Sequence, residues 1–185
     1  MGGDQGRSAA GGINLQRRFQ LRACVAILLL LSGCESENFT EVEKARAPLI
    51  SGFESYASLK EVTAKLSQDV EVKIVADTSL AKNSSQPPYR IHTIRIAPFE
   101  HLNQPGKLLL IFFNDRLEQS SFYPEKVDSY ASALAKNWLV LKIGAEVVQG
   151  NTVIWDGQDE DQNRFVGWAD KRLREQRRRW LARYH

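Results

Sequence analysis

The chain has 185 residues, a formal net charge of +3 at pH 7 and 43% hydrophobic residues. At about 100–200 residues per domain, this length predicts one globular domain with a core of its own. A net charge this small argues against a general nucleic-acid-binding protein, which would usually be strongly basic.

The N-terminal segment has the order of a secretory signal peptide. A basic cluster ends at Arg22, an uncharged apolar run covers 23–31 (ACVAILLLL), and the small residues of LSGC follow, ending at Cys34. The apolar run is shorter than the roughly 20 residues that a membrane span needs. We therefore interpret residues 1–33 as a cleaved signal peptide. The structural alternative is a buried core helix that happens to contain a cysteine.

The LSGC sequence resembles the lipobox of bacterial lipoproteins. That resemblance implies that Cys34 is fatty-acylated and becomes the first residue of the mature chain. Several acyl chains on one residue give a stable membrane anchor. The next residue is Glu35 rather than the aspartate associated with inner-membrane retention in some bacteria, so the resemblance implies the outer membrane. Since Cys24 leaves with the signal peptide, the mature chain has no thiol for a disulfide or a soft-metal site.

The mature chain divides into a tether and a domain. Residues 34–48 are charged and lack apolar periodicity, so we expect a lipidated tether there, followed by a single domain over 49–185. Charge is unevenly distributed: residues 34–163 have a net charge of −6, whereas residues 164–185 have a net charge of +6. The basic C-terminal segment is the most distinctive part of this domain.

The first elements are a short helix and two strands. The capping-box pattern S-x-x-E begins at Ser58, which predicts a helix over 59–67. Alternating apolar residues predict strands over 70–76 and 90–97, the second with a bulge. The segment between these strands, 77–88, is rich in turn-forming residues.

A continuous apolar run over 107–113 (KLLLIFF) predicts a central strand that is covered on both faces. We expect this strand to account for most of the burial, and the side chains of Leu109, Ile111 and Phe113, which share one face, to matter more to stability than any ion pair visible in the sequence. A turn at 114–115 then leads to a hairpin strand over 117–123.

The remaining pattern completes an α+β fold, with an antiparallel sheet of meander and hairpin strands and a few flanking helices. Pro124 suits a helix start, and the spacing of apolar residues predicts a helix over about 125–136. The elements predicted after this helix are a strand over 138–143, a hairpin of 152–155 with 164–168, and a basic terminal helix over 170–184.

One further resemblance rests on the order of these features. A lipobox, a tether, a short S-L-x-E-V-x-x-x-L helix and the strand sequence GKLLLIFFNDRL together resemble the SmpA/OmlA (BamE)-like outer-membrane lipoproteins over residues 53–123. That resemblance implies a small α+β domain that assists outer-membrane assembly by contacting protein and lipid. It identifies no binding residue in this chain.

We find no catalytic or metal-binding pattern. The histidines His92, His101 and His185 have no ligand spacing, and no G-x-S-x-G or H-E-x-x-H motif occurs. We expect His92 to be an exposed strand residue. The acidic cluster within 156–161 lacks the spacing of an EF-hand and favours a solvated hairpin loop over a calcium site.

Asn114, Asp115 and Arg116 follow the central strand, where a binding loop at the rim of the sheet is one interpretation. The simpler interpretation is a turn made by Asn114 and Asp115, with Arg116 in solvent.

The terminal segment 169–185 combines aromatic and basic residues at helical spacing. Leu173, Trp180 and Tyr184 lie near one helical face, with arginines on the remainder. Three interpretations remain open: packing on the core, docking on the acidic part of the domain, or contact with an anionic lipid surface or a protein partner. The residues expected at such a contact are Arg172, Arg178, Arg179, Trp180, Arg183 and Tyr184.

The sequence as a whole predicts a non-enzymatic lipoprotein of the cell envelope. Anchored by Cys34, it would face the periplasm from the outer membrane and bind an envelope protein or a lipid, without a cofactor. The alternative is a periplasmic module that binds a small ligand in a pocket between the sheet and its helices, and a third interpretation is an enzyme.

Overall fold

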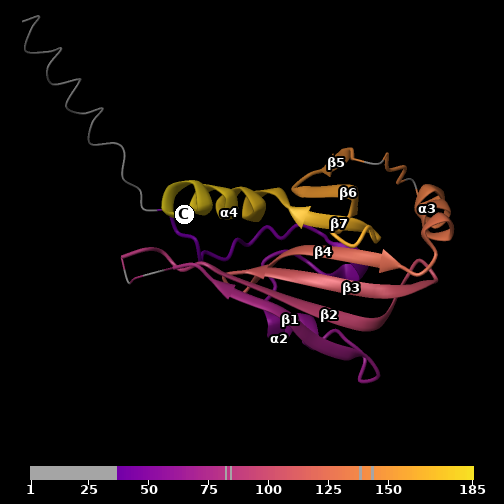
Figure 1. Ribbon diagram of the computed structural model, residues 1–185, viewed down its shortest axis with the longest axis horizontal. Coiled ribbons are helices and arrows are strands. Elements are labelled where there is room, and N and C mark those ends of the chain that lie inside the picture. Colours follow the sequence, from indigo (N-terminus) through magenta and orange to yellow (C-terminus); the bar gives the residue numbers. More distant parts are fainter. Residues whose placement is uncertain (1–36, 82, 84, 138, 143) are drawn as a thin grey trace, which may run out of the picture. The chain divides into compact units, whose positions relative to one another are not determined.

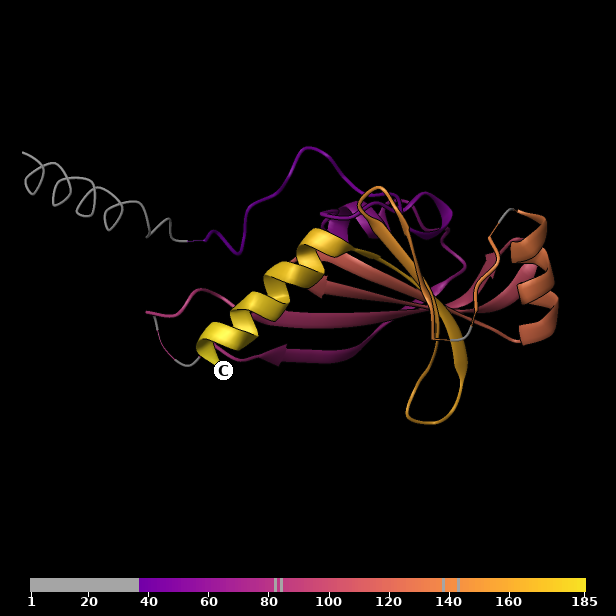
Figure 2. The same cartoon turned by 90° about the horizontal axis from the view of Figure 1, so that it is seen from above.

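A computed structural model describes residues 37–185 except 82, 84, 138 and 143 (Figures 1 and 2). The chain divides into two compact units, 1–37 and 38–185. The expected signal peptide and Cys34 lie outside the described residues. The second unit, 38–185, forms the folded domain.

The domain is built on one antiparallel sheet of seven strands, with helices packed against it, which confirms the predicted α+β class. The order of strands across the sheet is β1-β2-β3-β4-β7-β6-β5. The strands are β1 (Glu71–Ser79), β2 (Arg90–His101), β3 (Gln104–Phe113), β4 (Arg116–Pro124), β5 (Glu146–Gln149), β6 (Thr152–Gln158) and β7 (Arg164–Asp170). The helical elements are η1 (Ile50–Gly52), α2 (Leu59–Thr63), α3 (Val127–Lys136) and α4 (Lys171–Tyr184).

The first four strands form a meander, in which two-residue turns connect β2 to β3 and β3 to β4, and a longer loop over 80–89 connects β1 to β2. Leu102 and Asn103, between β2 and β3, both have positive φ angles of 54° and 57°. Two consecutive residues with positive φ angles are typical of a type I′ turn, whose twist matches the right-handed twist of the two strands that it connects. β7 then pairs with β4, and the hairpins β6–β7 and β5–β6 extend the sheet on that side.

The two faces of the sheet hold separate clusters of buried side chains. On one face, apolar residues from β2, β3, β4 and β7 pack against segment 49–57, α2 and α3. On the other face, Phe113 packs with Phe39, Tyr89 and Trp180 of α4. This arrangement confirms that β3 is a central strand.

The buried face of β3 is the one opposite to our expectation. Leu108, Leu110 and Phe112 have no exposed surface, whereas Leu109 and Ile111 are only half-buried. The apolar run KLLLIFF has no polar alternation, so its sequence does not distinguish the two faces. Only Phe113 of the expected set is fully buried.

Two helices are confirmed by their caps. The Ser58 side chain accepts a hydrogen bond from the Glu61 amide, and Glu61 accepts one from the Ser58 amide, which begins α2. α2 is shorter than predicted and ends at Thr63. Asp170 accepts a hydrogen bond from the Arg172 amide and begins α4 at the predicted position.

The expected strand over 138–143 is wrong, because residues 139–142 contain no strand. Instead, the Leu139 amide donates to the Leu134 carbonyl and closes the end of α3. Leu139 and Leu141 pack partly against the core, so their alternation serves packing rather than a β-ladder. The strand that follows is β5, which the sequence did not predict.

Much of the predicted tether is part of the domain. Phe39 is 2% exposed, and its carbonyl accepts hydrogen bonds from Asn114 Nδ2 at 2.9 Å and from Arg116. Arg116 Nη1 also donates to the Glu41 carbonyl at 2.6 Å, and the Ala47 amide donates to Ser55 Oγ at 2.7 Å. The compact unit therefore begins at 38, so residues 38–48 of the expected tether belong to the domain.

Candidate functional site

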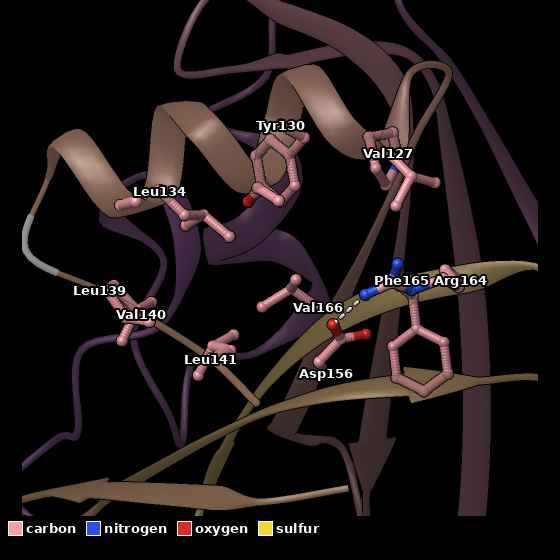
Figure 3. A pocket seen from close by; sticks show the side chains of 13 residues that line it. Val127, Tyr130, Leu134, Leu139, Val140, Leu141, Asp156, Arg164, Phe165 and Val166 are labelled. Carbon is pink, nitrogen blue, oxygen red and sulfur yellow. Dashed lines mark hydrogen bonds and ion pairs between the residues drawn. The ribbon is translucent and has the colours of Figure 1, made fainter. Parts of the chain in front are cut away.

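An apolar pocket lies beneath α3, between that helix, segment 139–141 and the β6–β7 hairpin (Figure 3). Its volume is about 180 Å³. An engineered cavity of about 150 Å³ binds benzene, so this pocket has room for one aromatic ring or a short alkyl segment. It is lined by Pro124, Val127, Tyr130, Ala131, Leu134, Ala135, Leu139, Val140, Leu141, Asp156, Arg164, Phe165 and Val166.

The walls of the pocket follow from local sequence patterns. Tyr130 and Leu134 lie one helical turn apart, so both point from α3 into the domain, and both are buried. Segment 139–141 returns beneath α3 and supplies the opposite wall. Val140 on this segment is 71% exposed, which leaves an apolar residue at the rim.

One ion pair provides the polar group at the pocket. Asp156 on β6 and Arg164 on β7 bond across the hairpin, and their side chains are 11% and 30% exposed. Figure 3 shows this pair beside Val166 and Phe165. Because each charge neutralises the other, the pair can accept and donate hydrogen bonds to a ligand without presenting a net charge.

A second polar contact supports the pocket from within the core. The Tyr130 hydroxyl lies 2.7 Å from Nδ1 of His101. Burial lowers the pKa of His101 to about 4, so this imidazole is neutral at pH 7. Burial also raises the pKa of Tyr130 far above its usual range. Both groups therefore stay uncharged and fix the position of α3.

The chemistry of this lining favours binding. Among the described lining residues, the ionisable groups are Tyr130, Asp156 and Arg164. The phenol is held in its neutral form and the two charged groups are paired, so none of them is poised as a general base or a nucleophile. What the pocket offers is apolar surface with a polar edge.

A shallower groove continues from the mouth of the pocket. It shares Pro124, Val127 and Arg164 with the pocket and extends to Lys107 and Tyr123. The Lys107 ammonium lies 4.7 Å from the centre of the Tyr123 ring. A ligand with an apolar end in the pocket would therefore meet polar side chains of the groove with its other end.

The structure separates the residues that the sequence grouped on the terminal helix. Trp180 has no exposed surface, and its Nε1 donates to the Pro87 carbonyl at 3.0 Å, so it cannot meet a membrane. Tyr184 packs against Trp180 and Phe39. Arg172 bonds to Asp170 and Glu43 within the domain. The exposed members of the expected set are Arg178, Arg179 and Arg183.

Two expectations about polar side chains are wrong. His92 is 5% exposed rather than solvated, because its ring stacks on Phe112 at 5.0 Å. Arg116 is 2% exposed and bonds to carbonyl groups of the N-terminal segment and of Phe113. Asn114 and Asp115 do form the turn, with φ angles of 48° and 60°.

The acidic loop between β6 and β7 is organised by its own side chains. Asp159 Oδ1 accepts hydrogen bonds from the amides of Asp161 and Asn163. Within the described part of the chain, no group of three His, Cys, Asp or Glu residues is arranged to hold a metal ion.

Sequence reasoning did not identify the buried polar contacts that hold the domain together. Glu118 has no exposed surface and pairs with Arg177 of α4 at 3.0 Å. Ser55 Oγ donates to the buried Asp170 at 2.7 Å. These partners are far apart in sequence, so no local pattern indicates them. The one available indication in the sequence was Glu118 itself, which is the single charged residue of the predicted strand LEQSSFY.

No helix among residues 37–185 that the structure describes is both long and apolar enough to span a bilayer. Comparison with known proteins adds no relative: no protein-family model matches the chain, and no curated protein matches it.

Proposed function

We propose that the protein is a non-catalytic binding protein of the bacterial cell envelope, anchored in the outer membrane by an acylated Cys34. Its domain binds an apolar group, one aromatic ring or a short alkyl segment, in the pocket beneath α3. The observation that carries this proposal is the pocket itself, because it combines apolar walls with a single neutralised ion pair. The anchor rests on the signal-like sequence and the lipobox resemblance.

The ligand has two possible sources that share this chemistry. A small periplasmic molecule would enter the pocket entirely. An envelope protein would insert an apolar side chain and would also cover the exposed Val140 at the rim. Hot-spot residues of protein interfaces fill pockets of this kind.

Ala131→Trp tests the pocket. Ala131 is exposed and lines the pocket, so a tryptophan there would occlude it without replacing a buried side chain. The matched control is Ser132→Trp, at an exposed neighbouring position outside the lining. Indole and hexanoic acid are the probes, and changes in amide NMR shifts are the measurement.

We expect both probes to shift signals of α3 and segment 139–141 in the wild type and in Ser132→Trp, but not in Ala131→Trp. Equal shifts in all three proteins would contradict the pocket assignment. Cross-linking from Val140→Cys to an envelope protein, blocked by Ala131→Trp, would identify the protein source. Absence of cross-links together with NMR binding would identify the small-molecule source.

Cys34→Ala tests the anchor separately. The variant should leave the membrane fraction or keep its signal peptide, because the acylated residue is gone. If it fractionates and migrates like the wild type, the lipid anchor is wrong.

A further inference from the structure

The C-terminal end of α4 lies close to the point where the chain leaves the domain. The Phe39 ring meets the Tyr184 ring edge-on, with centroids 6.2 Å apart. Hydrogen bonds from Asn114 and Arg116 fix the Phe39 carbonyl. Phe39 is therefore a firm attachment point beside the last turn of α4.

The expected acylated residue, Cys34, lies only five positions before Phe39, with four residues between them. Even when fully extended, the five steps from Cys34 to Phe39 span at most about 18 Å. A chain anchored at Cys34 therefore cannot place Phe39 farther than this from the membrane surface. The tether of 34–48 that the sequence suggested would have allowed a much greater distance.

The surface beside this point is strongly basic. Residues 177–185 contain four arginines and no aspartate or glutamate. Arg177 points inward to Glu118, whereas Arg178, Arg179 and Arg183 are exposed. The Arg178 side chain is 76% exposed even though it pairs with Glu175. Trp180 faces the core, so the exposed arginines lie on the outward side of α4.

From these two observations we infer that Arg178, Arg179 and Arg183 bind the anionic headgroups of the membrane in which Cys34 is anchored. This inference rests on the proposed lipid anchor. Basic side chains held within reach of an anionic bilayer are attracted to it, and the attraction acts over about 8–10 Å at physiological salt. The short connection to Cys34 keeps the end of α4 close to the membrane, and the arginines turn this end of the domain toward the headgroups.

This orientation has a consequence for the pocket. In both views, α3 and the C-terminal end of α4 lie at opposite ends of the sheet (Figures 1 and 2). With the α4 end on the membrane, the pocket beneath α3 is held away from the headgroups. The anchored domain thus presents its pocket to molecules outside the bilayer.

The test measures energy transfer from single-cysteine reporters to acceptor-labelled headgroups, with the processed, lipidated protein in vesicles. Acylated Cys34 does not react with a thiol label, so Ala182→Cys on α4 and Ser132→Cys on α3 each carry one fluorophore. Both positions are exposed. Vesicles contain either phosphatidylglycerol with phosphatidylcholine or phosphatidylcholine alone.

We expect stronger transfer from position 182 than from position 132 in the anionic vesicles. Reversing Arg178, Arg179 and Arg183 to glutamate should lower transfer from position 182 to the level of position 132. The matched control reverses Lys126, Lys136 and Lys142, three exposed lysines in and beside α3, and should leave the difference intact. If the arginine variant fails to fold, the triple glutamine variant makes the same test.

Equal transfer from both positions while the protein stays on the vesicles would overturn this inference but leave the anchor intact. An equal effect of the lysine control would also overturn it, because the contact would then depend on net charge alone. Wild-type protein that washes off the vesicles contradicts the anchor, and the inference fails with it.

Discussion

Arg177 Nη2 lies 3.0 Å from Oε1 of Glu118, a carboxylate with no exposed surface. Glu118 is the extra residue of a β-bulge, since Ile111 pairs with Gln119 and Phe112 pairs with Leu117. A bulge turns a side chain away from its regular direction. Here it directs a carboxylate to α4, and the pair joins the terminal helix to the centre of the sheet.

Arg177→Met should therefore destabilise the domain by about 3 kcal/mol, because it leaves a buried carboxylate without its partner. The double variant Arg177→Met/Glu118→Met should recover most of this loss in urea unfolding. Arg174→Met, which breaks a half-exposed pair with Glu146, is the control and should cost less than about 1 kcal/mol.

Burial raises the pKa of Glu118 above its usual value, and the charge of Arg177 opposes this rise. Removing Arg177 should raise the pKa of Glu118 further. The Arg177→Met loss should consequently be smaller at acid pH, where Glu118 is protonated in both states, than at pH 8, where the unfolded chain ionises it in water and the folded variant must bury its charge unpaired. A double variant as unstable as Arg177→Met would contradict this account.

His101 should make the stability of the domain depend on pH. Burial lowers its pKa from 6.5 to about 4, so the unfolded chain binds a proton in a range where the folded chain does not. The contribution of His101 to the free energy of unfolding is therefore fully present above pH 6.5, and it is lost as the pH decreases toward 4. The expected loss between pH 7 and pH 5 is about 2 kcal/mol.

Urea unfolding at several pH values measures this loss. His101→Gln should flatten the curve over this range, whereas His185→Gln, at the exposed C-terminus, should leave it unchanged. If both variants have the slope of the wild type, His101 is not the titrating group.

Asn114 should stabilise the domain through its side-chain hydrogen bonds rather than through its positive φ angle. Its side chain donates to the carbonyls of Phe39 and Pro88 and accepts from the Arg90 amide. Asn114→Gly keeps the positive φ of 48° without strain but loses all three bonds. At about 1 kcal/mol each, the expected destabilisation is about 2–4 kcal/mol.

The control is Asp115→Gly, because Asp115 also has a positive φ but its side chain is 71% exposed. That variant should be neutral or slightly more stable. Hydrogen exchange should accelerate at the Arg90 amide in Asn114→Gly only. Equal effects of the two glycine variants would assign the role to the backbone.

The two faces of β3 should differ in their cost of truncation. Leu110 has no exposed surface, and Leu110→Ala should cost about 2–5 kcal/mol. Leu109→Ala, on the half-buried face of the same strand, should cost clearly less. Thermal unfolding of both variants measures the difference, and a larger loss at Leu109 would reverse our assignment of the core face.

The elements that the sequence predicted well are those with local physical signals. The capping box at Ser58, the polar-to-apolar switch at Lys107 and the arginine-rich helix that begins after Asp170 are each visible within a few residues. These signals depend only on neighbouring residues in the chain. The two helices and the strand that they predict are therefore present in the structure, with small changes in where each element begins or ends.

The features that the sequence missed depend on residues far apart in the chain. The charged segment 38–48 packs on the domain because Arg116 and Asn114 satisfy its carbonyl groups. The pocket needs α3 and the β6–β7 hairpin to meet, and segment 139–141 to pass between them. Neither composition nor periodicity contains that information, since both describe only local order.

The insertion of β7 between β4 and β6 has a consequence for biogenesis. A chain that appears N-terminus first can complete the β1–β4 meander early, but the outer edge of β4 stays unpaired until residues 164–170 arrive. Unpaired edges of apolar strands recruit other chains. The nascent polypeptide is thus most vulnerable to aggregation just before its last strand emerges, when a chaperone that shields β4 would help most.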